Sequence, residues 1–157
     1  GTPGDDTLVG TAGDDTMDGR AGNDLIEAGL GNDTIINSGG GQDTFDGGGG
    51  VDTLMTDVTG LLPEYVLLFD AVNGAHGRKD TALGRDTVID IENFIMQGDW
   101  DAELIGNGVD NLLRSANGDD TLQGGAGDDT LDGGTGNDLL IGGQGSDTII
   151  VDSSGDR

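Results

Sequence analysis

Large apolar residues recur along much of this chain at intervals of nine residues, in the same local setting each time. Each follows an Asp by two positions, most often as D-T-L or D-T-I, with polar or small neighbours. Alternation of this kind over a few residues predicts a short β-strand with one side chain facing a core. A fixed period across many such strands is the signature of a repeat architecture.

The repeating unit has nine positions, G-G-x-G-x-D-x-U-x, where U is a large apolar residue. A first run occupies residues 1–55, with Asn37 as an extra residue, and a second occupies residues 105–150, with Arg114 as an extra residue. Position six holds Asp6, Asp15, Asp24, Asp33, Asp43, Asp52, Asp110, Asp120, Asp129, Asp138 and Asp147. Position eight holds Leu8, Met17, Ile26, Ile35, Phe45, Leu54, Leu112, Leu122, Leu131, Leu140 and Ile149.

The glycines in the first half of the unit predict a tight turn, because glycine allows positive φ and close backbone approach. One unit is therefore a turn plus a short strand, and two units make one coil of a flattened solenoid. Successive coils stack as parallel strands about 4.8 Å apart. This stacking places each position-six Asp near the Asp two units away, on the same edge.

The net charge of the chain indicates that such a stack needs a bound cation. It has 31 Asp and Glu against 6 Lys and Arg, a net charge of −25. Charges about 4 Å apart repel by roughly 1 kcal/mol even in bulk water, so the Asp columns require a cation. Carboxylate and carbonyl oxygens suit Ca²⁺, whereas zinc and copper favour His or Cys. The chain has one His and no Cys.

Charge and composition exclude several partners and structural features. Phosphate repulsion disfavours nucleic acid and an anionic membrane surface. No apolar stretch approaches the length of a membrane span. The absence of Cys excludes a disulfide framework.

The repeat resembles the repeats-in-toxin (RTX) family, which implies a parallel β-roll with Ca²⁺ between turns two units apart. In that family one turn gives its Asp and the carbonyls of positions two and four, and the other gives its Asp and the carbonyls of positions one and three. The implied pairs are Asp6–Asp24, Asp15–Asp33, Asp24–Asp43, Asp33–Asp52, Asp110–Asp129, Asp120–Asp138 and Asp129–Asp147. About seven Ca²⁺ would bring the net charge of −25 to roughly −11.

The resemblance also implies a set of carbonyl ligands. In the first run these are Thr2, Gly4, Gly19, Ala21, Thr11, Gly13, Ala28, Leu30, Arg20, Gly22, Ser38, Gly40, Gly29, Gly31, Gly47 and Gly49. In the second run they are Gly106, Gly108, Gly124, Ala126, Ala116, Gly118, Gly133, Thr135, Gly125, Gly127, Gly142 and Gln144. Replacement of a glycine leaves the carbonyl in place wherever the backbone can adopt the turn.

Residues 56–104 lack the glycine pattern. They are predicted to carry strands at 65–69 and 86–96 and a loop at 72–85. Asp86 keeps position six of a partial unit, and Asp101 lies nine residues before Asp110. We expect the solenoid to continue here with longer strands and one bulged loop. Two separate rolls joined by a small β insert, and a flexible linker, are the alternatives.

Single residues outside the repeat have simple interpretations. His76 is expected in a loop and Trp100 as a packing residue. Arg78, Lys79 and Arg85 hold half of the positive charge in one predicted loop. We expect a solvated loop there. Contact with an anionic polysaccharide or an adjoining domain is the alternative.

Catalytic patterns are absent from the sequence. Asp90 and Glu92 share one face of the predicted strand, but nothing else supports a glycosidase pair. HExxH, P-loop and dinucleotide fingerprints do not occur.

We predict an all-β fold, a parallel β-roll (a right-handed β-solenoid) with one bulged insertion. It is one structural domain with parts 1–55, 56–104 and 105–157. Gly1 indicates a fragment or processed product, and residues 150–152 are expected to continue as a strand with no capping element after it.

The expected function is a non-catalytic module that folds on binding calcium. The resemblance implies a secreted, extracellular protein exported through a one-step channel, with any activity elsewhere in the parent protein. The alternatives are a carbohydrate-associated module of an alginate-epimerase-like enzyme and a self-associating adhesin or surface-layer spacer.

Overall fold

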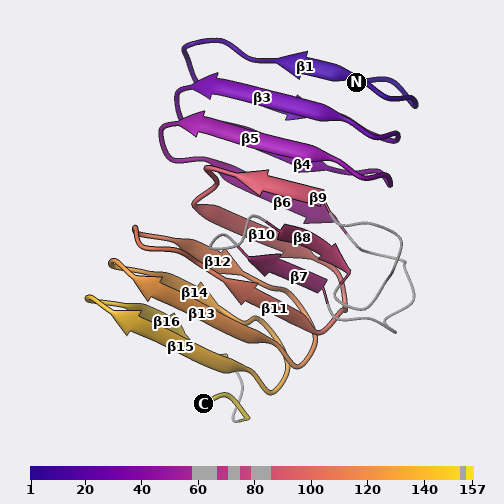
Figure 1. Ribbon diagram of the computed structural model, residues 1–157. Helices are drawn as coiled ribbons and strands as arrows, with labels where there is room; N and C mark the ends of the chain where they lie inside the picture. The colour runs from indigo at the N-terminus through magenta and orange to yellow at the C-terminus, as the bar shows by residue number, and fades with distance from the viewer. Residues whose placement is uncertain (58–66, 71–74, 79–85, 153–154) are drawn as a thin grey trace.

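Parallel strands stack into two facing sheets that run the length of the molecule (Figure 1). The computed structural model describes residues 1–57, 67–70, 75–78, 86–152 and 155–157. Within these ranges there is no helix, and so none that could cross a bilayer. The predicted all-β solenoid, a parallel β-roll, is confirmed.

The strands are short because each is only the second half of a nine-residue unit. The first sheet holds β1 (Thr7–Val9), β3 (Leu25–Leu30), β5 (Thr44–Gly49), β7 (Leu67–Asp70), β8 (Ala75–Arg78), β9 (Asp86–Ile89), β11 (Ala102–Ile105), β13 (Thr121–Ala126) and β15 (Leu139–Gln144). The second sheet holds β2 (Thr16–Asp18), β4 (Thr34–Asn37), β6 (Thr53–Asp57), β10 (Asn93–Gln97), β12 (Leu112–Arg114), β14 (Thr130–Asp132) and β16 (Thr148–Ile150).

The position-eight side chains fill the space between the sheets. Parallel pairing sets Leu8 beside Ile26 in the first sheet and Met17 beside Ile35 in the second, so each sheet contributes a column of inward-facing side chains. Ile26 and Ile35 are fully buried. Each such side chain gains about 1.5–3 kcal/mol from burial. With one large apolar residue per unit, the core is thin for the length of chain that it must order.

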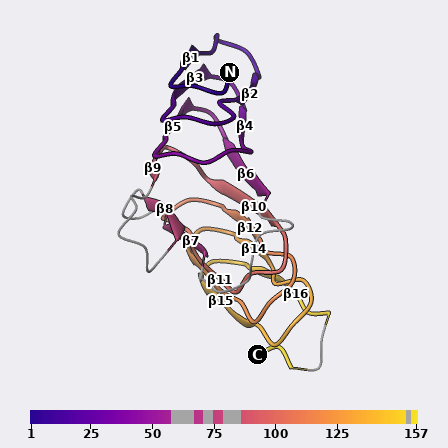
Figure 2. The ribbon, with the colours of Figure 1, turned by 90° about the vertical axis from the view of Figure 1, so that its right-hand side faces the viewer.

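A two-strand wedge separates the two repeat runs in the first sheet. There β7 pairs parallel with β11, whereas β8 is antiparallel to both β7 and β9. In the second sheet β6 pairs directly with β10, and β10 with β12, all parallel. Among the described residues one sheet thus has nine strands and the other seven, and the coils above and below the wedge are offset (Figure 2). The coils therefore share both sheets and run without a break through the second.

Three local expectations about strands are wrong. The predicted strand at 86–96 is two strands, β9 and β10, joined by a turn at residues 90–92. The sequence does not reveal the turn, because Ile91 within it is buried, as Val88 and Phe94 are, and so continues the apolar alternation. The predicted loop at 72–85 contains β8, so His76 lies in a strand. At the C-terminal end β16 stops at Ile150 instead of continuing to residue 152.

The register of the second run is also corrected by the structure. Leu113 pairs with Leu131 and is fully buried, so the first unit of this run spans residues 106–114 rather than 105–113. Arg114 is therefore no insertion but occupies position nine, where its Nε lies 3.0 Å from Oδ2 of Asp132. Position six is Asn111, and Asp110 moves to position five.

Trp100 occupies position four of a turn that precedes β11. It is only 2% exposed and belongs to the apolar core, so its predicted packing role is confirmed.

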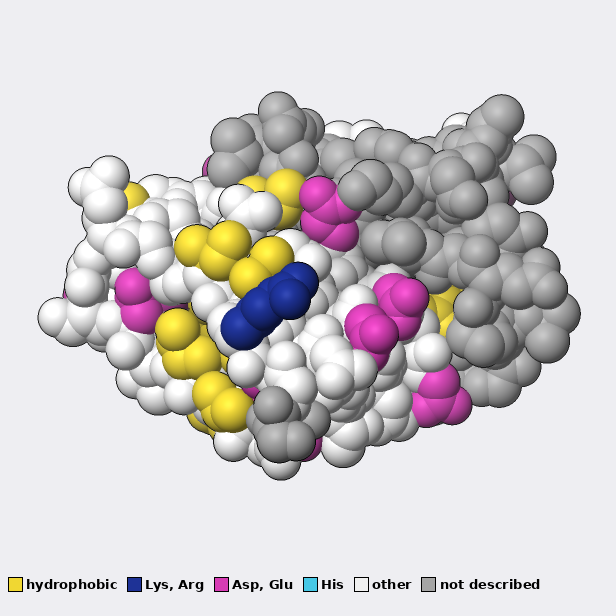
Figure 3. Space-filling model, turned by 90° about the horizontal axis from the view of Figure 1, so that it is seen from below, with side chains coloured by type: hydrophobic (Ala, Val, Ile, Leu, Met, Phe, Trp, Pro, Cys, Tyr) yellow, Lys and Arg dark blue, Asp and Glu magenta, His cyan; other side chains and the backbone are white. Residues whose placement is uncertain are grey.

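Apolar side chains are exposed at the C-terminal end of the roll (Figure 3). Ile149 at position eight is 44% exposed, whereas Leu131, its neighbour in the second sheet, is fully buried. The difference arises because Ile149 lies in the last coil, which is packed on one side only.

Candidate metal centre

The position-six carboxylates form a hydrogen-bonded series along each edge of the roll, which we call the position-six ladder. The backbone N–H of one position-six residue donates to Oδ1 of the Asp two units later. Asp15 donates to Asp33 at 2.7 Å, for example. The same bond joins Asp6 to Asp24, Asp24 to Asp43, Asp33 to Asp52, Asp120 to Asp138 and Asp129 to Asp147. Six of the seven predicted pairs are thus brought together.

In six of the ladder carboxylates the second oxygen is buried and has no hydrogen-bond partner within the described ranges. This holds for Oδ2 of Asp24, Asp33, Asp52, Asp120, Asp129 and Asp138. A buried acceptor without a partner costs about 1–3 kcal/mol, and more when it is charged. The column of Oδ2 atoms is therefore unfavourable unless another group contacts it.

The surroundings of these oxygens fit a calcium ion. The position-one glycine lies against Oδ2 of its own unit, so that a Cβ on Gly47 would come within 2.6 Å of Oδ2 of Asp52. A Cβ on Gly124 would clash with Oδ2 of Asp129 and lie 2.7 Å from the carbonyl oxygen of Gly142, in the next turn. Carboxylate and carbonyl oxygens thus face one small space, which is the donor set that Ca²⁺ takes.

Backbone conformation brings the carbonyls of neighbouring turns close together. Gly125 and Gly127, at positions two and four, have φ of 115° and 125°. A Cβ at either would clash with or crowd the backbone of Asn107 or Val109 in the turn before. Only glycine adopts this conformation freely. Arg20 adopts φ 75° at position two, which shows that the turn can impose its geometry on another residue.

Burial raises the pKa of several ladder carboxyls. The pKa of Asp120 rises from 3.8 to about 6, chiefly through desolvation, with the charges of Asp138 and Asp101 adding to it. The pKa values of Asp52, Asp129 and Asp138 are raised for the same first reason. Desolvation and like charge both oppose ionisation, so a bound cation would relieve both.

A family model for the RTX calcium-binding nonapeptide repeat matches residues 1–35, 35–54 and 114–149, more than half of the chain. The chain belongs to this family. The RTX repeats make it a calcium-binding module. The comparison with curated proteins returned no matching relative.

The seventh predicted pair, Asp110–Asp129, is wrong. Asn111 donates its backbone N–H to Oδ1 of Asp129 at 2.9 Å, and the Asp110 carboxylate accepts instead from the backbone of Asp128. Gly106 and Gly108 consequently occupy positions one and three rather than two and four. The sequence misled because both Asp110 and Asn111 are followed two residues later by Leu, and only pairing with the neighbouring coils separates the two registers.

The RTX ladder extends beyond the residues predicted to form it. Asp86 accepts from Asp43, Glu92 from Asp52 and Asp156 from Asp138. Asp156 lies nine residues after Asp147, so the period alone could have found it. Glu92 carries no such signal because the turn before it is shortened. Ala102, not Asp101, is the position-six residue before Asn111, and it donates to Asp120.

A second series at position five runs in the opposite direction, and sequence reasoning missed it. Here the backbone N–H of the later unit donates to the side chain of the earlier one, as from Asn23 to Asp5 and from Asn137 to Asp119. The side-chain amide of Asn137 also donates to Asp119, and this bond together with the backbone bond lowers the pKa of Asp119. The Asp-Asp and Asn-Asp doublets of the RTX unit therefore have two roles: the first residue joins adjacent coils and the second enters the position-six ladder.

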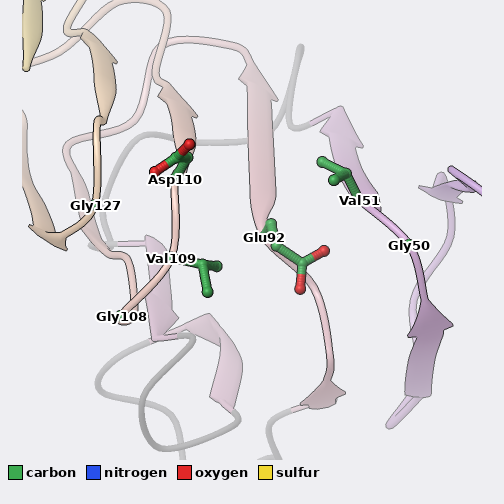
Figure 4. Close-up of a pocket in the computed structure, with 7 residues that line it drawn as sticks. All are labelled: Gly50, Val51, Glu92, Gly108, Val109, Asp110 and Gly127. Carbon is green, nitrogen blue, oxygen red and sulfur yellow. The ribbon is translucent and has the colours of Figure 1, made fainter.

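One turn of the RTX pattern is shortened. Only Asp90 and Ile91 lie between the end of β9 at Ile89 and the ladder residue Glu92. Asp90 has a positive φ of 47°. A hollow of about 540 Å³ remains between the neighbouring turns. It is lined by Gly50, Val51, Glu92, Gly108, Val109, Asp110 and Gly127 (Figure 4). The shortened turn has fewer carbonyl oxygens to offer than a full one, so the Asp52–Glu92 step is the least complete of the first run.

The cationic cluster of Arg78, Lys79 and Arg85 lies outside the residues whose side chains the structure describes, as does the side chain of His76. Asp90 and Glu92 do not share a strand face, since both belong to the turn between β9 and β10.

Calcium affinity is expected to fall as the pH falls from 7 to 5. In a roll that the other calcium ions keep folded, an empty Asp120 site has a pKa above its unfolded value of 3.8, so it binds a proton in this window. That proton stabilises the empty site as the pH falls through about 6, and Ca²⁺ must displace it to bind there. A site with a pKa of about 6 would lose roughly tenfold in affinity at pH 5. Calorimetric titrations at both pH values measure this; equal affinities would contradict it.

The corrected register is tested by Asn111→Asp and Asp110→Asn. Asn111→Asp adds a carboxylate to the ladder and is expected to lower the calcium concentration at the folding midpoint by several-fold, because affinity rises with ligand charge. Asp110→Asn removes an acid that lies outside the ladder and is expected to change the midpoint by less than about twofold. The midpoints are measured by circular dichroism during calcium titration. A large rise in the midpoint for Asp110→Asn would contradict the corrected register and support the one predicted from the sequence.

Proposed function

We propose that this chain is a non-catalytic module of a secreted protein that folds when calcium fills its turns. The observation that carries the proposal is the column of buried Oδ2 atoms without hydrogen-bond partners, beside carbonyl oxygens of the next turn. The buried acids of the described chain all lie in the position-six ladder, so the proposal assigns them to calcium and none to catalysis.

The energetics support folding on binding rather than binding to a folded roll. Ordering the backbone costs about 1–2 kcal/mol per residue, and this core has one large apolar side chain per nine-residue unit. A ligand at a hundred times its Kd adds about 2.7 kcal/mol per site. About seven sites would add roughly 19 kcal/mol, more than the usual net stability of about 5–15 kcal/mol. Without calcium that contribution is absent and the carboxylates repel.

The proposed extracellular location follows from the dependence of folding on calcium. Calcium is abundant outside the cell and scarce in the cytosol, so a chain of this kind would remain extended during export and fold on arrival. The RTX family is consistent with an extracellular location.

A calorimetric calcium titration of the calcium-free chain, with stoichiometry, tests the proposal. We expect about seven to nine ions per chain, because the ladder joins six of the predicted pairs and adds Asp43–Asp86, Asp52–Glu92 and Asp138–Asp156. One or two ions, or none, would overturn it. Circular dichroism on the same samples establishes whether β-structure appears together with binding.

A further inference from the structure

A third carboxylate joins the ladder at the C-terminal end of the roll. Asp138, Asp152 and Asp156 each place a carboxylate oxygen within 4.8 Å of the others. Asp138 and Asp156 are successive position-six residues. Asp152 lies at position two of the last unit, and no other unit of the chain has an acid at that position.

The cluster has a buried component aimed into it. Asp138 is 1% exposed, and its Oδ2 has no hydrogen-bond partner among the described residues. Its Oδ1 is already used, because it accepts from the backbone of Asp120 at 2.9 Å. Oδ2 of Asp138 is therefore the atom left to face the two later carboxylates. Burial is the main cause that raises the pKa of Asp138, and the charges of Asp156 and Asp152 raise it further.

Residues 155–157, which include Asp156, are docked beside β15 by hydrogen bonds of Asp156 and Arg157. Arg157 N–H donates to the carbonyl of Asp138 at 2.9 Å, and Leu140 N–H donates to the carbonyl of Arg157 at 2.9 Å. Asp138 N–H donates to Oδ1 of Asp156 at 3.1 Å. These bonds hold the carboxylate of Asp156 beside that of Asp138. Asp152 adds a third negative charge to this pair, which is unfavourable without a cation.

We propose that Asp138, Asp152 and Asp156 form a three-carboxylate calcium site that fastens the C-terminal segment to β15. The inference rests on the proposed calcium-dependent folding. Calcium affinity depends on the number of charged ligands, so this site binds Ca²⁺ more tightly than the turns that offer two carboxylates. It also gives the exposed last coil an attachment that its partly exposed Ile149 does not supply.

Two adjacent amides in β15 report on the site separately. Leu140 N–H bonds to Arg157 in the terminal segment, whereas Leu139 N–H bonds to Asp120 in the preceding coil at 2.8 Å. Hydrogen exchange of both amides is followed by NMR at increasing Ca²⁺ in the wild-type chain, in Asp152→Asn and in Glu27→Gln. Glu27→Gln is the matched control, because it removes one charge from an exposed strand position far from the cluster.

Asp152→Asn is expected to raise the calcium concentration that protects Leu140 by about tenfold or more and to leave Leu139 unchanged. Glu27→Gln is expected to change neither. Unchanged protection of Leu140 in Asp152→Asn would overturn the three-carboxylate site while Leu139 still responds to calcium. If neither amide of the wild-type chain responds to calcium, the proposed function itself fails.

Discussion

Removal of calcium with excess chelator is expected to convert this chain from a β-rich roll to an unfolded polypeptide. The net charge of −25 is then uncompensated, and the ladder carboxylates lose the cations that separate them. The buried Oδ2 atoms would also keep their desolvation cost with no ligand in return. Loss of the β-signal by circular dichroism, with an increased hydrodynamic radius, is the expected result.

Two controls separate coordination from charge screening. Sodium chloride at 1 M shortens the Debye length to about 3 Å, so it weakens repulsion without supplying ligands. Salt in the presence of chelator is expected to leave the chain unfolded. Magnesium should also fail, because it needs a smaller octahedral shell and retains its waters. A β-rich spectrum in excess chelator would overturn calcium-dependent folding, and recovery in salt alone would assign the effect to screening.

Asp129→Asn is expected to be among the most damaging single substitutions in the second run. Asp129 belongs to two ladder steps, since it accepts from Asn111 and donates to Asp147. The amide oxygen of Asn could still accept the Asn111 bond, so the substitution removes the charge and the calcium ligand rather than the hydrogen bond. We expect the calcium midpoint of folding to rise at least about tenfold, equivalent to about 1.4 kcal/mol.

The neighbouring Asp128→Asn is the matched control. Asp128 is exposed at position five, and its carboxylate accepts from Ser146 at 2.8 Å, a bond that an amide oxygen can also accept. The two variants lose the same charge one residue apart. Calcium titrations followed by circular dichroism should therefore shift strongly for Asp129→Asn and little for Asp128→Asn. Equal shifts would mean that net charge, and not the ladder, determines affinity.

The regular part of the roll could be predicted in detail because period and geometry agree there. Nine residues make a turn and a strand, and two units make a coil, so residues 18 apart are stacked neighbours. Asp15 and Asp33 are such a pair, and the structure joins them. Where one residue is inserted, as at Asn37, the separation becomes 19, and the Asp24–Asp43 bond is kept. The sequence showed that insertion because the glycine pattern resumed immediately after it.

The irregular part could not be predicted, because the residues there satisfy two interpretations. Asp110 and Asn111 each precede a Leu by two residues, and the alternation from Asp86 to Met96 passes through a turn without a break. Local pattern does not record which coil a strand joins. Pairing of Leu113 with Phe94 and Leu131 fixed the register, and pairing of Asn93 with Thr53 placed β10 in the second sheet.

The sequence by itself determined the solenoid, the position-six carboxylates and the need for a cation, because all three follow from a repeat read one unit at a time. Tertiary structure decided the wedge of β7 and β8, the shortened turn before Glu92 and the terminal cluster at Asp138. These depend on which distant strands become neighbours, and that is set by packing between coils rather than by the spacing of residues along the chain.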